Sequence, residues 1–95
     1  MKLLMVVYHE ELERQVMKIV SEELPVPRFT QLDSVIGAGS LNWQQDAQAC
    51  TLKRNRLVII VQDDQMIKDL MGRFRELRES AGGLRAFVMP VEEVV

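Results

Sequence analysis

Glycine and arginine residues near the end of the chain have the types and spacing that could bind a phosphate group. Gly82 and Gly83 are adjacent, and Arg85 follows two positions later. The backbone N–H groups of a glycine turn can form a concave anion site, to which an arginine adds charge. The same glycines also suit an ordinary turn between a helix and a strand. Gly37 and Gly39 have two similar interpretations, as the wall of a cleft or as the exit from a strand.

A short basic cluster precedes the most apolar stretch of the chain. Lys53, Arg54 and Arg56 could face a phosphate or an acidic surface of a partner protein. A run of solvated charges before a strand is the alternative interpretation. Trp43 lies upstream in the same region, and an indole ring is a favoured anchor in protein interfaces, although it could equally cover the base of its own loop.

The residue types that usually carry catalysis or bind metals form no recognisable constellation. His9 is the only histidine and Cys50 the only cysteine, and they lie far apart in the sequence. His9 is adjacent to Glu10 and Glu11, but consecutive helical residues point in different directions, whereas zinc sites need three or four converging ligands. We therefore predict neither an enzyme nor a metal site within one chain. A single cysteine also excludes an intrachain disulfide, which favours a reduced, cytoplasmic location.

The apolar pattern predicts the elements that carry these residues. Residues 57–61 form an uninterrupted apolar run that is typical of a central strand. Asp63 and Asp64 follow it, where a carboxylate can cap the first turn of a helix. An apolar stripe at helical spacing then predicts an amphipathic helix, with the members Met66, Ile67, Leu70, Met71, Phe74 and Leu77.

Three further strands and one helix complete the pattern. Residues 3–8 predict a second central strand, followed by a helix that ends before Pro25. Residues 29–36 suit an outer strand, and residues 84–89 the last one. Residues 40–55 show no apolar period, and we expect this loop to serve recognition. The order β-α-β-β-α-β predicts an α+β, ferredoxin-like fold: a four-stranded antiparallel sheet with two helices on one face.

Length and charge limit the kinds of partner. The 95 residues suit one domain over residues 1–95. A net charge of -2 gives no electrostatic reason to expect nucleic acid or an anionic membrane as a partner. The apolar residues 1–8 are too few to insert into a membrane. Because the central strands are apolar in both phases, the helix-free face of the sheet needs a cover, and we expect a homo-oligomer.

Three segments of the chain resemble the PII signal-transduction family. They are RLVIIVQDDQ, the final GGLRAFVMPVEEVV, and LDSVIGAG. The resemblance spans nearly the whole chain and implies a homotrimer that binds an adenine nucleotide (ATP, ADP or AMP) as an effector in clefts between subunits, with no firm cofactor. It implies a nitrogen-regulator-like signalling protein whose loop acts on a partner such as a transporter or an enzyme. Gln62, Asp63 and Asp64 join the nucleotide site by resemblance alone, because this turn adjoins the adenine pocket in the family.

The chain departs from the family pattern in its loop and around its glycines. Residues 40–55 contain no tyrosine, which argues against control by uridylylation, and Ser40 and Leu41 stand where family members have an Arg-Gln pair. Leu84 replaces the second glycine of the family's GDGK turn, and the sequence ends at Val95, before further phosphate-binding arginines of the family. Two alternatives stay open: a metal-ion-sensing or metal-tolerance-linked trimer of the same fold, and an interaction module without a small ligand.

Overall fold

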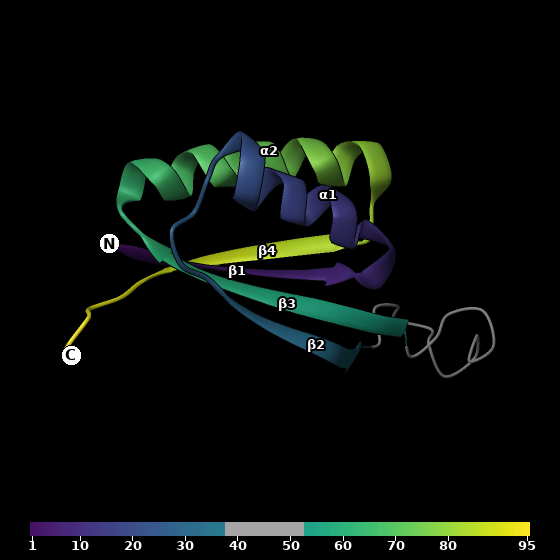
Figure 1. Ribbon diagram of the computed structural model, residues 1–95, viewed down its shortest axis with the longest axis horizontal. Helices are drawn as coiled ribbons and strands as arrows, with labels where there is room; N and C mark the ends of the chain where they lie inside the picture. Colours follow the sequence, from purple (N-terminus) through teal and green to yellow (C-terminus); the bar gives the residue numbers. More distant parts are fainter. Residues whose placement is uncertain (38–52) are drawn as a thin grey trace.

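The computed structural model describes residues 1–37 and 53–95. Its elements are β1 (Lys2–His9), η1 (Glu10–Leu12), α1 (Glu13–Lys18), η2 (Ile19–Glu23), β2 (Thr30–Gly37), β3 (Lys53–Gln62), α2 (Asp64–Ala81) and β4 (Leu84–Pro90). The strands form one antiparallel sheet in the order β2-β3-β1-β4. Both helices lie over the same face of this sheet (Figure 1), which confirms the predicted α+β, ferredoxin-like fold.

The first helical segment changes its hydrogen-bonding pattern along its length. It begins with the 3₁₀ turn η1, continues as α1 and ends in the wider π-helical turn η2. After η2 the Leu24 N–H donates to the carbonyl of Ile19, five residues earlier, at 2.8 Å. Pro25 follows and cannot continue the pattern, because it has no N–H. The helix predicted to end before Pro25 is confirmed, but it is not a uniform α-helix.

α2 is a regular helix with a defined cap at each end. Asp63 Oδ1 accepts the Met66 N–H at 2.8 Å, so the predicted capping role of Asp63 is confirmed. Gly82 ends the helix with a φ of 69°, and its N–H donates to the Arg78 carbonyl at 2.8 Å. The buried face of α2 carries Ile67, Leu70, Phe74 and Leu77.

The core lies between the helices and the sheet. The pairing of β1 with β3 places Leu4 opposite Ile60 and Val6 opposite Val58. These four side chains point toward the helices, because alternate residues of a strand share a face, and all four are fully buried. Side chains from both helical segments pack in the same cluster, among them Val16, Ile19, Val20, Ile67, Leu70 and Phe74.

The opposite face of the sheet has no helix over it, and we call it the open face. Its exposed apolar side chains are Leu32, Val61, Phe87 and Met89, which are 47%, 38%, 50% and 44% exposed. Each of them aligns across the sheet with a β1 residue whose side chain points away from the helices, on the opposite face from Leu4 and Val6. The open face is the surface that the sequence pattern predicts to be covered by another copy of the chain.

β3 begins earlier than the apolar pattern predicts. Its first residue, Lys53, pairs with Gly37 on β2. Residues 53–55 therefore belong to a strand, and the predicted loop boundary at Asn55 is wrong, because backbone pairing with β2 extends β3 through polar residues. β2 itself contains an irregularity between Leu32 and Val35, which explains why residues 29–36 are polar in both phases.

A glycine substitution in α2 tests this description. Gly72 lies in the helix, and a Cβ added there would meet no atom within 4 Å. We expect Gly72→Ala to raise the free energy of unfolding by about 0.5–1 kcal/mol, because alanine restricts the unfolded chain and favours the helix. Urea denaturation at a fixed protein concentration measures this change.

Gly83→Ala is the matched control. Gly83 has a φ of 67°, a conformation that costs an alanine about 1 kcal/mol or more, so the same substitution should lower the free energy of unfolding there. A destabilised Gly72→Ala protein would contradict the described conformation of α2.

Candidate functional site

Four chain segments meet at one end of the sheet. β1 ends at His9, which pairs with Asn55 on β3. β4 begins beside β1 at the same end, and Gly37 at the end of β2 pairs with Lys53. Because neighbouring strands are antiparallel, these strand ends lie side by side (Figure 1), and we call this region the His9 end of the sheet.

Most of the predicted binding residues lie at the His9 end. They come from the end of β2, the start of β3, the turn before β4 and the start of β4 itself: Gly37, Lys53, Arg54, Gly82, Gly83 and Arg85. The side chains of Arg54 and Arg85 are exposed. Arg85 pairs with Val7 and shares its phase with Phe87, so it lies on the open face. Gly39, Trp43 and Cys50 lie outside the described residues.

The remaining predicted residues lie at the other end of the sheet. Gln62 pairs with Lys2, seven residues along β1 from His9, which corresponds to roughly 23 Å. Asp63 caps α2, whereas Asp64 is its first residue and pairs with the amino group of Met1 at 3.2 Å. Within one subunit, the fold therefore separates these three residues from those at the His9 end.

The turn between α2 and β4 requires both of its glycines. Gly82 and Gly83 have φ values of 69° and 67°, which other residues rarely adopt. The Gly83 carbonyl accepts the His9 N–H at 2.9 Å, which ties the turn to the end of β1. Among the described residues, no backbone carbonyl accepts the Gly83 N–H. The exposed Arg85 follows this turn by two positions on the same chain segment.

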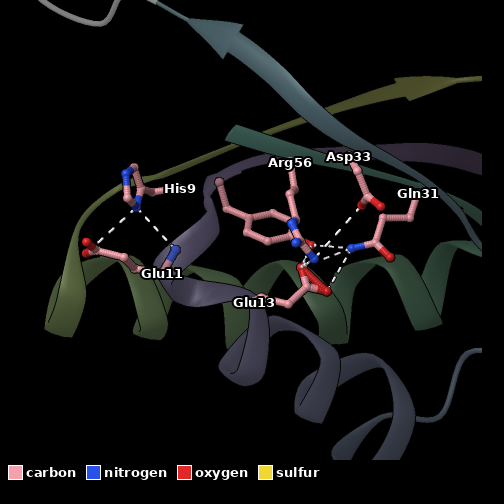
Figure 2. A network of polar contacts seen from close by, with 7 residues as sticks. His9, Glu11, Glu13, Gln31, Asp33 and Arg56 are labelled. Atoms are coloured by element: carbon pink, nitrogen blue, oxygen red, sulfur yellow. Dashed lines mark hydrogen bonds and ion pairs between the residues drawn. The ribbon is translucent and has the colours of Figure 1, made fainter. Parts of the chain in front are cut away.

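A polar network lies beneath this end of the sheet, on the side of the helices (Figure 2). The Tyr8 hydroxyl donates to Glu13 Oε2 at 2.7 Å, and Gln31 Nε2 donates to Glu13 Oε1 at 2.8 Å. Arg56 pairs with Glu13 Oε2 at 2.9 Å, and Asp33 Oδ1 lies 3.9 Å from the same guanidinium group. The network joins β1, α1, β2 and β3 around one carboxylate.

The charges of this network are fixed by their partners. Burial of Glu13 opposes ionisation, but hydrogen bonds from Gln31, Tyr8 and Arg56 outweigh it and hold the pKa of Glu13 below its ordinary value. Burial and the neighbouring Glu13 carboxylate raise the pKa of Tyr8 well above its ordinary range. Neither shift brings a pKa closer to neutral pH, so the network suits a structural role better than acid–base chemistry.

Sequence patterns did not identify this network. Tyr8 sits in a strand that is otherwise apolar, and Arg56 stands in the sequence as part of a basic cluster. Their meeting depends on the register that pairs Tyr8 with Arg56 across β1 and β3. A tyrosine in the helix-facing phase of a central strand, followed by the acidic residue Glu13, is the only local signal, since a buried hydroxyl needs a partner.

Two further observations concern the described residues, 1–37 and 53–95. They contain no group of three histidine, cysteine or acidic side chains placed to hold a metal ion. Within the same ranges, no helix has the length and apolar character needed to cross a membrane.

Comparisons with known proteins identify the chain's relatives. The model of the family "Nitrogen regulatory protein P-II" matches residues 1–95. CPII from Thiomonas intermedia K12, bound to ADP, AMP and bicarbonate, is 16% identical with a TM-score of 0.73, over 99% of this chain and 94% of that chain. The same protein bound to ADP, AMP and acetate gives 16% identity and a TM-score of 0.72, over 92% of this chain and 81% of that chain.

A second relative comes from another organism. A PII-like signaling protein from Thermus thermophilus is 20% identical with a TM-score of 0.62, over 93% of this chain and 82% of that chain. A comparison with curated protein sequences gives no match. The two structural relatives thus share the fold of this chain at low sequence identity.

The structure defines a ferredoxin-like chain whose sheet carries exposed apolar side chains on its helix-free face. The family match covers the whole chain. The chain belongs to the nitrogen regulatory protein P-II family, whose members are regulatory signalling proteins, and the resemblance seen in the sequence is confirmed.

The single tyrosine makes the polar network testable by alkaline titration. The pKa of Tyr8 is raised from its ordinary 10.0, so the folded protein should resist tyrosinate formation at that pH. Above that pH the unfolded chain ionises first, so the free energy of unfolding should fall as the pH rises. We expect the near-ultraviolet tyrosinate absorbance to stay flat through this pH while circular dichroism remains native. In concentrated urea the transition should return to its ordinary midpoint.

Tyr8→Phe provides the baseline for this titration. A tyrosinate signal with its midpoint near 10.0 in the natively folded protein would show that Tyr8 is not held by Glu13 and Gln31.

Proposed function

We propose that this chain is a PII-like regulatory protein that forms a homotrimer and binds an adenine nucleotide at the His9 end of the sheet. The ligand-dependent state is passed to a partner protein, such as a transporter or an enzyme. The protein acts as a cytoplasmic regulator and not as an enzyme. Residues 40–52 of the predicted recognition loop carry this last step, and they lie outside the described part of the chain.

The convergence of separate sequence candidates carries the proposal. The Gly82–Gly83 turn with Arg85, Gly37, and the basic residues Lys53 and Arg54 come from three parts of the sequence. Strand pairing brings them to one end of the sheet, where Arg54 is in the helix-facing phase of Arg56 and Arg85 lies on the open face. Backbone donors and guanidinium groups are the chemistry that recognises phosphate, which an adenine nucleotide supplies. Residue 37 also joins β2 to the predicted recognition loop, which would place ligand and loop next to each other.

The open face supports assembly into an oligomer. Phe87, Met89, Leu32 and Val61 leave between 38% and 50% of their surface exposed on one face of the sheet. Soluble monomers rarely expose such a continuous apolar surface, whereas a second copy of the same face would cover it. Family membership favours three copies, as the resemblance in the sequence implies.

The separation of the predicted residues supports a site between subunits. Gln62 and Asp63 lie roughly 23 Å from the His9 end of their own sheet. A single nucleotide that contacts both groups would therefore take them from different subunits. An intersubunit cleft, with phosphates at the glycine turn of one subunit and adenine at the Gln62 turn of a neighbour, reconciles the two sets.

The relatives suggest which effectors to test first. The CPII structures contain ADP and AMP, with bicarbonate in one and acetate in another. We extend adenine nucleotides to this chain as effectors, and we include bicarbonate as a second one. No observation in the described residues favours the metal-sensing alternative, and an interaction module without a ligand is the outcome if no nucleotide binds.

A charge placed on the open face tests the assembly. We expect the wild-type protein to have three times its subunit mass by light scattering and Phe87→Lys to dissociate, because the lysine cannot be buried without a partner. Gln15→Lys adds the same charge on the exposed surface of α1 and should leave the trimer intact. A monomeric wild-type protein at micromolar concentration would contradict the proposed assembly.

Removal of Arg85 tests the nucleotide site. We expect ATP, ADP or AMP to bind once per subunit in isothermal titration calorimetry, and Arg85→Ala to weaken binding by about tenfold or more, since a charge-assisted contact to phosphate is lost. Arg75→Ala removes an exposed arginine from α2 and serves as the control. The absence of binding by all three nucleotides, with and without bicarbonate, would refute the sensor function.

A further inference from the structure

His9 makes two contacts at the strand end and leaves one ring nitrogen unused. Its backbone N–H donates to the Gly83 carbonyl at 2.9 Å. Its Nδ1 accepts the Glu11 N–H at 3.2 Å, as the N-cap of η1. Figure 2 shows the second ring nitrogen, Nε2, on the side of the ring away from Glu11. Among the described residues, Nε2 has no hydrogen-bond partner.

The hydrogen bond from the Glu11 N–H favours one tautomer of the ring. A nitrogen that accepts a hydrogen bond carries no proton, so the neutral imidazole holds its proton on Nε2. Nε2 is therefore a hydrogen-bond donor aimed away from the helix. The Glu11 carboxylate lies 3.7 Å from Nδ1, on the far side of the ring from Nε2. The side of the ring that carries Nε2 is thus free to face an anion.

The glycine turn lies beside the end of β1 that carries His9. A Cβ built on Gly83 would lie 3.6 Å from the Cβ of His9, so the turn is close to the base of the His9 side chain. The Gly83 N–H has no backbone acceptor among the described residues, and the exposed Arg85 follows on the same chain segment. His9 shares its phase with Val7, which pairs with Arg85, so His9 and Arg85 lie on the same face of the sheet, one on β1 and one on β4.

We propose that His9 is a binding residue for the effector's phosphate, and that Nε2–H donates to a phosphate oxygen held at the Gly82–Gly83 turn. The Glu11 N–H acts through His9 by keeping the proton on Nε2. This inference rests on the proposed nucleotide site and adds a donor from β1 to the glycine turn and Arg85. It also assigns to the single histidine a role other than metal binding.

Two substitutions separate the two ring nitrogens. His9→Asn keeps a side-chain oxygen that can cap η1 in place of Nδ1, but it has no donor at the position of Nε2. His9→Gln places an amide N–H near the position of Nε2 but cannot cap the turn in the same way. We measure ADP binding by calorimetry for both variants and the wild type, with adenosine as the ligand that lacks phosphate.

The order of the two variants decides the outcome. We expect His9→Asn to bind ADP about tenfold more weakly than the wild type, with His9→Gln closer to the wild type and adenosine binding equal in all three. If His9 served only to cap η1, His9→Gln would bind ADP more weakly than His9→Asn, because His9→Gln loses the cap. That order of affinities would overturn the inference. Unchanged ADP affinity in His9→Asn would also overturn it while leaving the nucleotide site in place. A wild-type protein that binds no ADP would remove both proposals.

A spectroscopic measurement tests the contact in the unaltered protein. His9 is the only histidine, so its ring nitrogens can be assigned without ambiguity in ¹⁵N NMR spectra. In mildly alkaline buffer we expect the tautomer protonated at Nε2, and ADP should shift the Nε2 resonance more than the Nδ1 resonance. A ring protonated at Nδ1, or an Nε2 resonance that ADP leaves in place, would contradict the proposed hydrogen bond.

Discussion

The register of β1 between its two neighbours is the constraint on which the rest of the subunit depends. β1 is paired with β3 on one side and β4 on the other, and it is apolar in both phases. A slip of one residue would move Leu4 and Val6 to the open face and turn Tyr8 away from Glu13. The tyrosine and its partners therefore specify a register that the apolar side chains alone would specify less well. The same register sets His9 against Gly83, so the core and the candidate site are fixed by one pairing.

The polar network extends this constraint to the edge of the sheet. β2 is an edge strand that pairs only with β3, and its pairing is interrupted between Leu32 and Val35. Gln31 precedes this irregularity and donates to both Tyr8 and Glu13, which connects β2 to the helical layer. An edge strand with a break in its ladder is otherwise held weakly. The network thus fixes the strand that leads into residues 38–52, without taking part in chemistry.

Sequence patterns predicted the parts of the fold that depend on local periodicity. The apolar strands, the stripe of α2, its Asp63 cap and the Gly82 terminus are confirmed, because each follows from the residues within the element itself. The start of β3 at Lys53 and the meeting of Tyr8 with Arg56 depend on partners distant in sequence, so no local pattern shows them. For the candidate site, the glycines and Arg85 stand out in the sequence, but their convergence with His9 emerges only once the strands are paired. The distance between Gln62 and the His9 end likewise follows from topology.

In the proposed trimer, assembly and ligand binding are linked through β4. Every second residue of β4 points to the same face of the sheet. Arg85, Phe87 and Met89 occupy such positions, so all three lie on the open face. Burial of Phe87 against another subunit would bring Arg85, two residues away, to the rim of the same interface, where the local dielectric is lower and its attraction for phosphate stronger. A ligand that also contacts a neighbouring subunit would bind the assembled form more tightly than the isolated chain, and it would then stabilise the assembly by mass action. In this proposal, β4 would link the apolar surface that drives association to the charge that selects an anionic effector.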